Sequence, residues 1–305
     1  MHIILGGTGH VGSATARALL RRGEPVTIVT RNGGHAAALQ EAGARVAVAD
    51  VRDVEALRRI LRTGTTALLL NPPAAPFTDT DAVERANAAA IVDAAADAGL
   101  ARAVAVSTFG ARPGEPCGDL TVLFEFEERL RALPFPVAVN RGAYYMSNWT
   151  EMLDTVRHRG RLPSFFPADT AIPMVAPEDL GEAAARRLLE PAGDSAIHAI
   201  EGPRRYTPRD VAQAFAQALG RPVDVDVIPR HAWEQTYRQL GFSPAAARSY
   251  ACMTGTVLDE QDRWPDAPER GATTLEAFIG AVVRQRLGQS GTFDLAQTES
   301  TKTTH

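Results

Sequence analysis

Lysine and cysteine are scarce in this sequence, and both shortages limit what the chain can do. Lys302, near the C-terminus, is the single lysine, so arginine carries nearly all of the positive charge. Cys117 and Cys252 are the only cysteines, and neither has histidines nearby at ligand spacing. This pattern indicates neither a disulfide framework nor a zinc site. We expect two buried, reduced thiols and no metal.

Strong net charge and long apolar runs are also lacking. The 305 residues carry a formal net charge of -4, with no block of like charges, which gives no basis for binding nucleic acid or an anionic membrane. No stretch approaches the roughly 18 apolar residues that a membrane span needs. The apolar N-terminal run is too short for a signal peptide and has no basic flank. We therefore expect a cytoplasmic protein without nucleic-acid or membrane partners.

Short apolar runs alternate with helical patterns through the first half of the chain. The apolar runs cover residues 3–5, 26–29, 46–49, 67–70, 103–106 and 137–139. The helical patterns between them cover residues 11–22, 36–42, 54–62, 80–98 and 121–133. Unbroken apolar runs suit strands covered on both faces, and the repeated alternation predicts an α/β fold with a doubly wound Rossmann parallel sheet.

The pattern becomes less regular after about residue 142. Prolines mark irregular connections, a strand-like run covers residues 198–201, and Thr207-Pro208 opens a helix that ends at Gly220. We assign residues 1–141 to the Rossmann domain, with a return segment at about 171–204. Residues 142–170 and 205–287 form a smaller, mostly helical substrate-binding cap, and residues 288–305 form a tail without periodicity.

A glycine-rich segment lies directly between the first expected strand and the first expected helix. A tight turn needs glycine, a pyrophosphate must approach bare backbone, and a helix N-terminus offers unpaired N–H groups. The placement therefore predicts a dinucleotide site rather than an ordinary glycine-rich turn. Its binding residues are Gly6, Thr8, Gly9, His10, Val11 and Gly12.

Arg31 follows the second expected strand, where an NAD-specific fold would place an acid for the ribose hydroxyl. A guanidinium there can hold a 2'-phosphate, which favours NADP(H), although a solvated surface arginine is the alternative. Asp50 and Val51, after the third strand, are expected beside the adenine. Asn71 and Pro72, after the fourth strand, are expected along the ribose.

Together these segments resemble the NmrA-like branch of the atypical short-chain dehydrogenase/reductases. The resemblance covers about residues 1–287 and also includes the segments 49–53, 106–111, 140–148, 177–180, 201–208 and 220–222. Family members are either NAD(P)H-dependent reductases, including quinone reductases, or regulators that bind the dinucleotide without turning it over. Classical members use a tyrosine and a lysine four residues later, but Leu120 and Phe124 occupy that neighbourhood here.

Four side chains are candidates for catalysis without that pair. Ser107 and Thr108 end the fifth strand, where a hydroxyl could bind a substrate oxygen, although they could instead cap a turn. Tyr145 could donate a proton or clamp the substrate, or only pack. His10 could face the nicotinamide or the phosphates. Trp149 and Phe165-Phe166 suggest an apolar roof, or simply core.

These residues predict an NADPH-dependent oxidoreductase that transfers hydride to a small conjugated or aromatic electrophile, such as a quinone, enone, imine or polyketide-like intermediate. The alternative is a non-catalytic NADP(H)-sensing regulator that acts through a protein partner. An enclosed apolar chamber would favour the enzyme. The sequence leaves a homodimer open.

Overall fold

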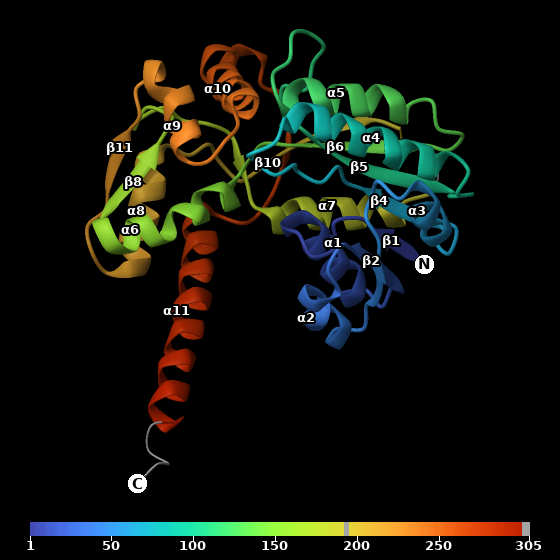
Figure 1. The fold of residues 1–305 in the computed structure, drawn as a ribbon, viewed down its shortest axis with the longest axis horizontal. Helices are drawn as coiled ribbons and strands as arrows, with labels where there is room; N and C mark the ends of the chain where they lie inside the picture. Colours follow the sequence, from blue (N-terminus) through green and yellow to red (C-terminus); the bar gives the residue numbers. More distant parts are fainter. Residues whose placement is uncertain (192–194, 301–305) are drawn as a thin grey trace.

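Eight parallel strands form one sheet in the computed structural model, which describes residues 1–191 and 195–300 (Figure 1). The strand order is β12-β10-β6-β5-β4-β1-β2-β3. The strands are β1 (His2–Ile4), β2 (Val26–Thr30), β3 (Arg45–Val48), β4 (Thr66–Leu69), β5 (Arg102–Thr108), β6 (Val137–Gly142), β10 (Ile197–Glu201) and β12 (Glu269–Arg270). The chain places β2 and β3 on one side of β1 and then crosses to the other side, where β4 and the later strands follow. The carboxyl ends of β1 and β4 therefore flank the switch point where such sheets bind ligands.

Helices cover both faces of this sheet, as the unbroken apolar runs predict. One face carries α1 (His10–Arg21), α2 (Ala37–Glu41) and α7 (Pro177–Leu189), which share a core with strand residues such as Ile4 and Ile28. The other face carries α3 (Val54–Leu61), α4 (Thr80–Ala96) and α5 (Asp119–Leu130), which pack on Ile3 and Leu5. The doubly wound parallel fold predicted from the sequence is confirmed.

The helices α1 and α7 lie unusually close together. A Cβ atom added at Gly181 of α7 would stand 2.5 Å from the Cβ of Ala14 on α1, so glycine permits this approach. Glu182 pairs with Arg22 at 2.7 Å and also with Arg21, which joins the exposed edges of the two helices. The helix that begins at the glycine-rich turn is therefore held by a segment much later in the chain.

A smaller part of the chain forms the cap, mostly from helices. It contains β7 (Tyr144–Tyr145), α6 (Leu153–Arg159), β8 (Arg161–Ser164), β9 (Met174–Val175), α8 (Pro208–Leu219), β11 (Asp224–Val227), α9 (Trp233–Gln239) and α10 (Pro244–Asp259). The expected helix start at Thr207 is a complete capping box with Asp210, and Gly220 ends α8 at a φ of 65°. The cap has its own core around Phe215 and Tyr206.

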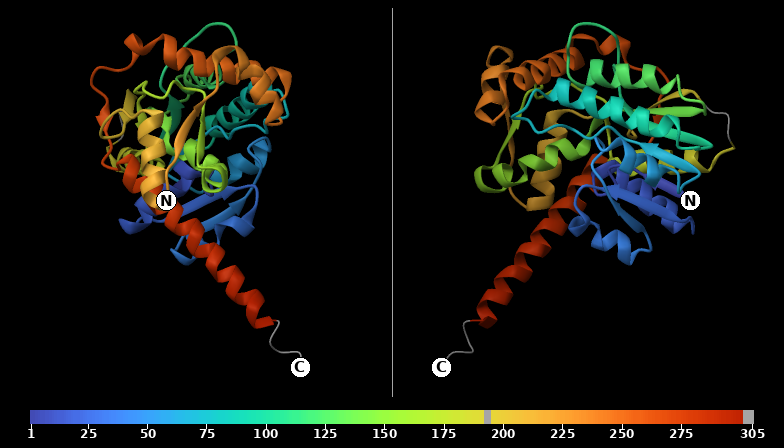
Figure 2. Two further views of the ribbon diagram at one scale, coloured as in Figure 1. Left: turned by 90° about the vertical axis from the view of Figure 1, so that its left-hand side faces the viewer. Right: turned by 45° about the vertical axis from the view of Figure 1, so that its right-hand side comes forward.

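The last helix, α11 (Leu275–Ser300), leaves the cap and projects from the body of the molecule (Figure 2). Phe278, Ile279 and Val283 anchor its first turns in the core of the cap. The segment from residue 288, expected as a tail without periodicity, is the end of α11 up to residue 300; residues 301–305 lie outside the described residues. Among the described helices none combines the length and apolar character that a membrane crossing requires.

A disulfide joins Cys117, just before α5, to Cys252 on α10. The expectation of two reduced thiols is therefore wrong. The cysteines are 135 positions apart in the sequence, and only the packing of the cap against the sheet brings them together. Cys117 is 3% exposed, whereas Cys252 is exposed. The link fastens the cap to the segment that follows β5.

Candidate functional site

The glycine-rich turn between β1 and α1 has the shape that a dinucleotide needs. Gly6 has a φ of 61°, and a Cβ atom at Gly12 would stand 2.2 Å from the Gly6 carbonyl oxygen. These two glycines are therefore required by the turn itself. Gly9, in contrast, is exposed, and its Cβ atom would approach only that same oxygen, at 3.3 Å. Backbone is thus bare where a phosphate would approach.

The N-terminus of α1 is open toward this side. Gly9 is its N-cap, no side chain caps it, and its first turn has no acidic residue. The first N–H groups of a helix have no partner within the helix and carry partial positive charge, which favours a phosphate. His10 is exposed and Val11 is buried in the same turn. The turn therefore fits the pyrophosphate of a dinucleotide.

Arg31 lies directly after β2, next to the turn. The hydroxyls of Thr8 and Thr30 are 3.0 Å apart, which ties the glycine-rich turn to the end of β2. Arg31 is exposed and has no ion pair among residues 1–191 and 195–300. Asn32 is occupied otherwise, because its side chain accepts from the Gly34 N–H at 2.9 Å. Arg31 is thus a cation at this edge that remains able to receive a phosphate.

The ends of β3 and β4 complete the same edge. The Asp50 carboxylate accepts from the Arg52 N–H at 2.9 Å, and Val51 is half-buried beside it. Asn71 donates through Nδ2 to the Glu84 carbonyl at 3.1 Å, while its buried Oδ1 has no partner among the described residues. Pro72 is half-buried next to Asn71. A buried acceptor at the switch point fits a ligand that brings a hydroxyl donor, as a ribose does.

Ser107 takes part in a buried polar network rather than facing open space. Its hydroxyl donates to Glu127 on α5 at 2.5 Å. Glu127 is 1% exposed and also accepts from Arg141 of β6 at 2.9 and 2.6 Å. The carboxylate is therefore fully partnered, and the Ser107 hydrogen is committed to it. Thr108, half-buried, donates only weakly to the Phe109 carbonyl at 3.3 Å.

Two carboxyl groups whose roles were not predicted from the sequence meet near this edge. Glu84 on α4 is buried and hydrogen-bonds to Asp119, the first residue of α5. Burial, together with the nearby Asp119 and Asp81 charges, raises the pKa of Glu84 to about 8. Desolvation of its carboxyl group also raises the pKa of Asp119, although the residue as a whole keeps solvent-exposed surface. Two carboxylates so placed share a proton near neutral pH, because both cannot ionise cheaply.

Two tyrosines lie close enough to this carboxyl pair for its charge to act on them. Burial and, secondarily, the Asp119 charge raise the pKa of Tyr145 well above its usual range. The same two causes, with Glu84 in addition, raise the pKa of Tyr250 on α10. Tyr145 is half-buried and its ring packs against Gly142. The structure thus brings one predicted catalytic residue, Tyr145, together with acids from two helices of the Rossmann part and a tyrosine of the cap.

The aromatic roof expected from the sequence divides into two parts. Trp149 and Phe166 are 4% and 3% exposed, and both pack on Tyr144 within the core of the cap. Phe165 is half-buried and stacks on Tyr237 with ring centroids 4.3 Å apart. Tyr237 in turn contacts Tyr250. Trp149 and Phe166 are therefore core. Phe165, Tyr237 and Tyr250 form a row of contacting rings, and Tyr250 is the one influenced by the carboxyl pair.

The expected Tyr-Lys positions hold apolar side chains on α5. Leu120 is buried and Phe124 is half-buried. The sequence contains no lysine besides Lys302, which lies outside the described residues.

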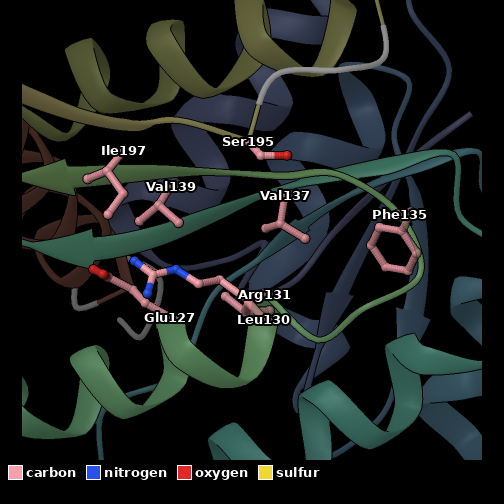
Figure 3. Close-up of a pocket in the computed structure, with 8 residues that line it drawn as sticks. All are labelled: Glu127, Leu130, Arg131, Phe135, Val137, Val139, Ser195 and Ile197. Carbon is pink, nitrogen blue, oxygen red and sulfur yellow. The ribbon is translucent and has the colours of Figure 1, made fainter.

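A hollow of about 140 Å³ opens elsewhere, between α5 and the strands β6 and β10 (Figure 3). Its lining includes Val137 and Ile197, which begin these strands. The amino ends of parallel strands lie opposite the edge that carries the glycine-rich turn. This hollow is therefore separate from the candidate dinucleotide site.

Comparison with known proteins identifies the family of this chain, and similar solved structures share its fold. The family model described as the NmrA-like family matches residues 2–253. An NAD(P)H azoreductase of Xenophilus azovorans is 24% identical over 287 residues, which is 92% of this chain and 97% of that protein.

Two solved structures illustrate the fold. The NADPH-dependent quinone oxidoreductase of Escherichia coli, complexed with NADPH, has a TM-score of 0.73 at 20% identity, covering 92% of this chain and 99% of its own. The triphenylmethane reductase of Citrobacter sp., complexed with NADP(H), has a TM-score of 0.72 at 19% identity, covering 93% and 99%.

Proposed function

The chain belongs to the NmrA-like family, and from this premise we propose that it is an NADPH-dependent reductase of a small conjugated or aromatic electrophile. Quinones, enones, imines, azo compounds and polyketide-like intermediates are the acceptor class. The observation that carries the proposal is the uncapped N-terminus of α1 behind bare glycine backbone, with Arg31 exposed at the end of the next strand. The similar proteins named an azoreductase, a quinone oxidoreductase and a triphenylmethane reductase support the proposal, because each name describes the reduction of a conjugated or aromatic compound.

Residues at the carboxyl ends of the strands would each contact a different part of NADPH. The N–H groups of the first turn of α1 would receive the pyrophosphate, Arg31 the 2'-phosphate, and the unpartnered Oδ1 of Asn71 a ribose hydroxyl. Asp50 and Val51 would border the adenine. When bound, NADPH supplies the hydride, and the protein supplies position and exclusion of water.

The proton has a source other than a Tyr-Lys pair. Tyr145 carries its proton at neutral pH, as an ordinary tyrosine does, and the raised pKa holds that proton more firmly, so the hydroxyl can donate a hydrogen bond to a substrate oxygen or nitrogen. The Glu84–Asp119 pair retains one proton close to neutral pH and can replace one lost from the site. We assign Tyr145 to the substrate contact and the carboxyl pair to proton supply. Thr108 and His10 stay candidates for substrate or nicotinamide contacts, whereas the hydroxyl of Ser107 is committed to Glu127.

An aromatic acceptor suits the surroundings of this pair. Tyr145, Tyr250 and Phe165 present ring surface, and an electrophile with conjugated bonds needs little acid assistance. Loss of the shared proton leaves the carboxyl pair with additional negative charge, which repels an anionic acceptor. Neutral or cationic acceptors are therefore favoured over carboxylated ones.

The test measures NADPH oxidation, monitored as the loss of NADPH absorbance, with a panel of quinones, enones, imines and azo dyes as acceptors. We expect turnover with at least one aromatic acceptor, and faster turnover with a neutral dye than with its sulfonated analogue. Tight NADPH binding without turnover of any acceptor would overturn the proposal and favour the dinucleotide-sensing regulator. Absence of NADPH binding would overturn both.

A further inference from the structure

The disulfide between Cys117 and Cys252 lies beside a second hollow on the cap. This hollow, of about 580 Å³, opens between the segment 230–235 and α10. The two elements that form it, α9 and α10, pack against each other at the top of the cap (Figure 1). Its lining consists of Arg230, His231, Trp233, Glu234, Gln235, Arg248, Ala251 and Cys252. One half of the disulfide is therefore part of a recess that solvent reaches.

The two sulfur atoms differ in access. Cys252 is exposed in the hollow, whereas Cys117 is 3% exposed and lies behind it. Thiol–disulfide exchange requires a thiolate to attack one sulfur while the other leaves. Attack at Cys252, with Cys117 as the leaving group, is the route that this arrangement permits.

The hollow carries a cation suited to a carboxylate. Arg230 is held by Asp259 through two hydrogen bonds of 2.8 and 2.6 Å, so its charge is balanced. Arg248 is exposed and has no ion-pair partner in the described part of the chain. It stands one helical turn before Cys252 on α10, and residues at this spacing lie on the same helix face. Trp233, fixed by a 3.0 Å hydrogen bond to the Ile228 carbonyl, supplies a firm wall.

The leaving sulfur also has support. Cys117 immediately precedes Gly118, the N-cap of the twelve-residue helix α5, but the Asp81 carboxylate accepts from the Gly118 N–H at 3.2 Å, so the main support comes from a neighbouring hydroxyl. The hydroxyl of Thr256 lies 3.8 Å from the Cys117 sulfur and can donate to it. A thiolate released at Cys117 is thereby stabilised, which speeds departure of this sulfur.

From these observations we propose that Cys252 is a site of reversible thiol exchange, which the hollow serves by receiving a small thiol that carries a carboxylate. The thiolate attacks the Cys252 sulfur and forms a mixed disulfide, while the Cys117–Cys252 bond breaks and its electron pair stays on Cys117. Water protonates that thiolate. A second thiol then attacks the sulfur of the first, which leaves two protein thiols and one oxidised small disulfide.

Opening this link changes the wall of the candidate active site. The Asp119 N–H contacts the Met253 sulfur at 3.2 Å, so the disulfide and this contact hold the start of α5 against α10. Release of Cys117 loosens the segment that positions Asp119 in the carboxyl pair. This consequence for turnover rests on the proposed reductase function, but the exchange itself does not.

The experiment exposes the full-length protein, without NADPH, to 3-mercaptopropionate or to the neutral 2-mercaptoethanol and maps the mixed disulfide by mass spectrometry. We expect the adduct on Cys252. Per unit of thiolate, 3-mercaptopropionate should open the link about two- to fivefold faster, the gain of one exposed ion pair. Arg248→Gln should remove this preference. Arg238→Gln, an exposed arginine of α9 outside the hollow, should keep it.

Three results would overturn the proposal. They are an adduct on Cys117, a disulfide that resists both thiols in the folded protein, and a preference that survives Arg248→Gln. Cys117→Ser provides a second arm, because its single remaining thiol at Cys252 should form an adduct with oxidised glutathione while the protein stays folded. A result that contradicts the thiol-exchange proposal leaves the reductase proposal standing, since none of these measurements involves NADPH.

Discussion

The hydroxyl of Ser107 donates a 2.5 Å hydrogen bond to the carboxylate of Glu127. This contact links the carboxyl end of β5 to the buried face of α5, and Arg141 completes the partners of the carboxylate. A serine at the end of a central strand is a natural candidate for substrate binding. Here its hydrogen stabilises a buried charge instead.

Ser107→Ala should therefore affect stability rather than turnover. Loss of a hydrogen bond to a buried carboxylate should lower the free energy of unfolding by about 1 to 3 kcal/mol. Denaturant unfolding measures this, and kcat of the folded variant should stay unchanged. A large fall in kcat at unchanged stability would return Ser107 to the substrate contacts.

Tyr145→Phe should slow turnover, because it removes the hydroxyl that we assign to the substrate. We expect a lower kcat with little change in NADPH affinity, measured by steady-state kinetics and fluorescence titration. Tyr144→Phe is the matched control, since Tyr144 packs in the core of the cap against Trp149. Equal rates for Tyr145→Phe and the unmodified protein would assign Tyr145 to packing.

Arg31→Gln should weaken NADPH binding and leave NADH binding nearly unchanged. A charge-assisted hydrogen bond contributes roughly 1.5 to 3 kcal/mol, which corresponds to about a 10- to 150-fold loss of affinity. Raised salt should narrow the difference, because Arg31 is exposed. Arg59→Gln on α3, another exposed arginine, is the control. If the unmodified protein binds both dinucleotides equally, Arg31 is only a surface cation.

Gly9→Ala and Gly12→Ala should fail in different ways. Gly9 has an extended backbone, and its added methyl group would meet only the Gly6 carbonyl oxygen, at 3.3 Å, so the alanine variant should fold after a small shift but bind NADPH more weakly, because the methyl group stands where phosphate approaches. At Gly12 the added atom meets backbone at 2.2 Å, so the turn must move and the melting temperature should drop. Calorimetry with NADPH and thermal unfolding separate the two effects. Unchanged affinity in Gly9→Ala would place the dinucleotide elsewhere.

Glu84→Gln should flatten the pH dependence of stability. An unfolded glutamate has a pKa of 4.5, whereas the pKa of folded Glu84 is raised to about 8. Unfolding therefore releases a proton between these values, so the free energy of unfolding of the unmodified protein should fall as pH rises from 5 to 8. The fall should be about 1 to 4 kcal/mol, at about 1.4 kcal/mol per pKa unit. Denaturant unfolding at several pH values measures it, and a parallel slope in Glu84→Gln would contradict the assignment.

The sheet could be predicted from the sequence because each central strand is a short apolar run bounded by turn residues. The glycine-rich turn could be predicted for the same reason, since both signals are local. Ser107 shows the limit of this reasoning, because its partner Glu127 lies on the next helix and only the fold decides where the hydroxyl points.

The carboxyl pair and the disulfide were missed for related reasons. Thr80, Asp81, Glu84 and Asn87 form a buried polar stripe on the otherwise alanine-rich α4, a spacing that could have drawn attention to Glu84. Its partner Asp119 looks like an ordinary acid in the first turn of a helix. The pairing of Cys117 with Cys252 depends on how α10 docks, and sequence spacing holds no information about that.

The close approach of Gly181 to Ala14 also constrains how the protein is made. The glycine-rich turn leaves the ribosome well before residues 177–189, yet the helix that follows the turn gains its cover only when those residues have been made. Until then one flank of α1 faces water. A nascent chain that ends before α7 should therefore bind a dinucleotide poorly, and the glycine-rich turn reaches its final form only after the segment 177–189 has been synthesised.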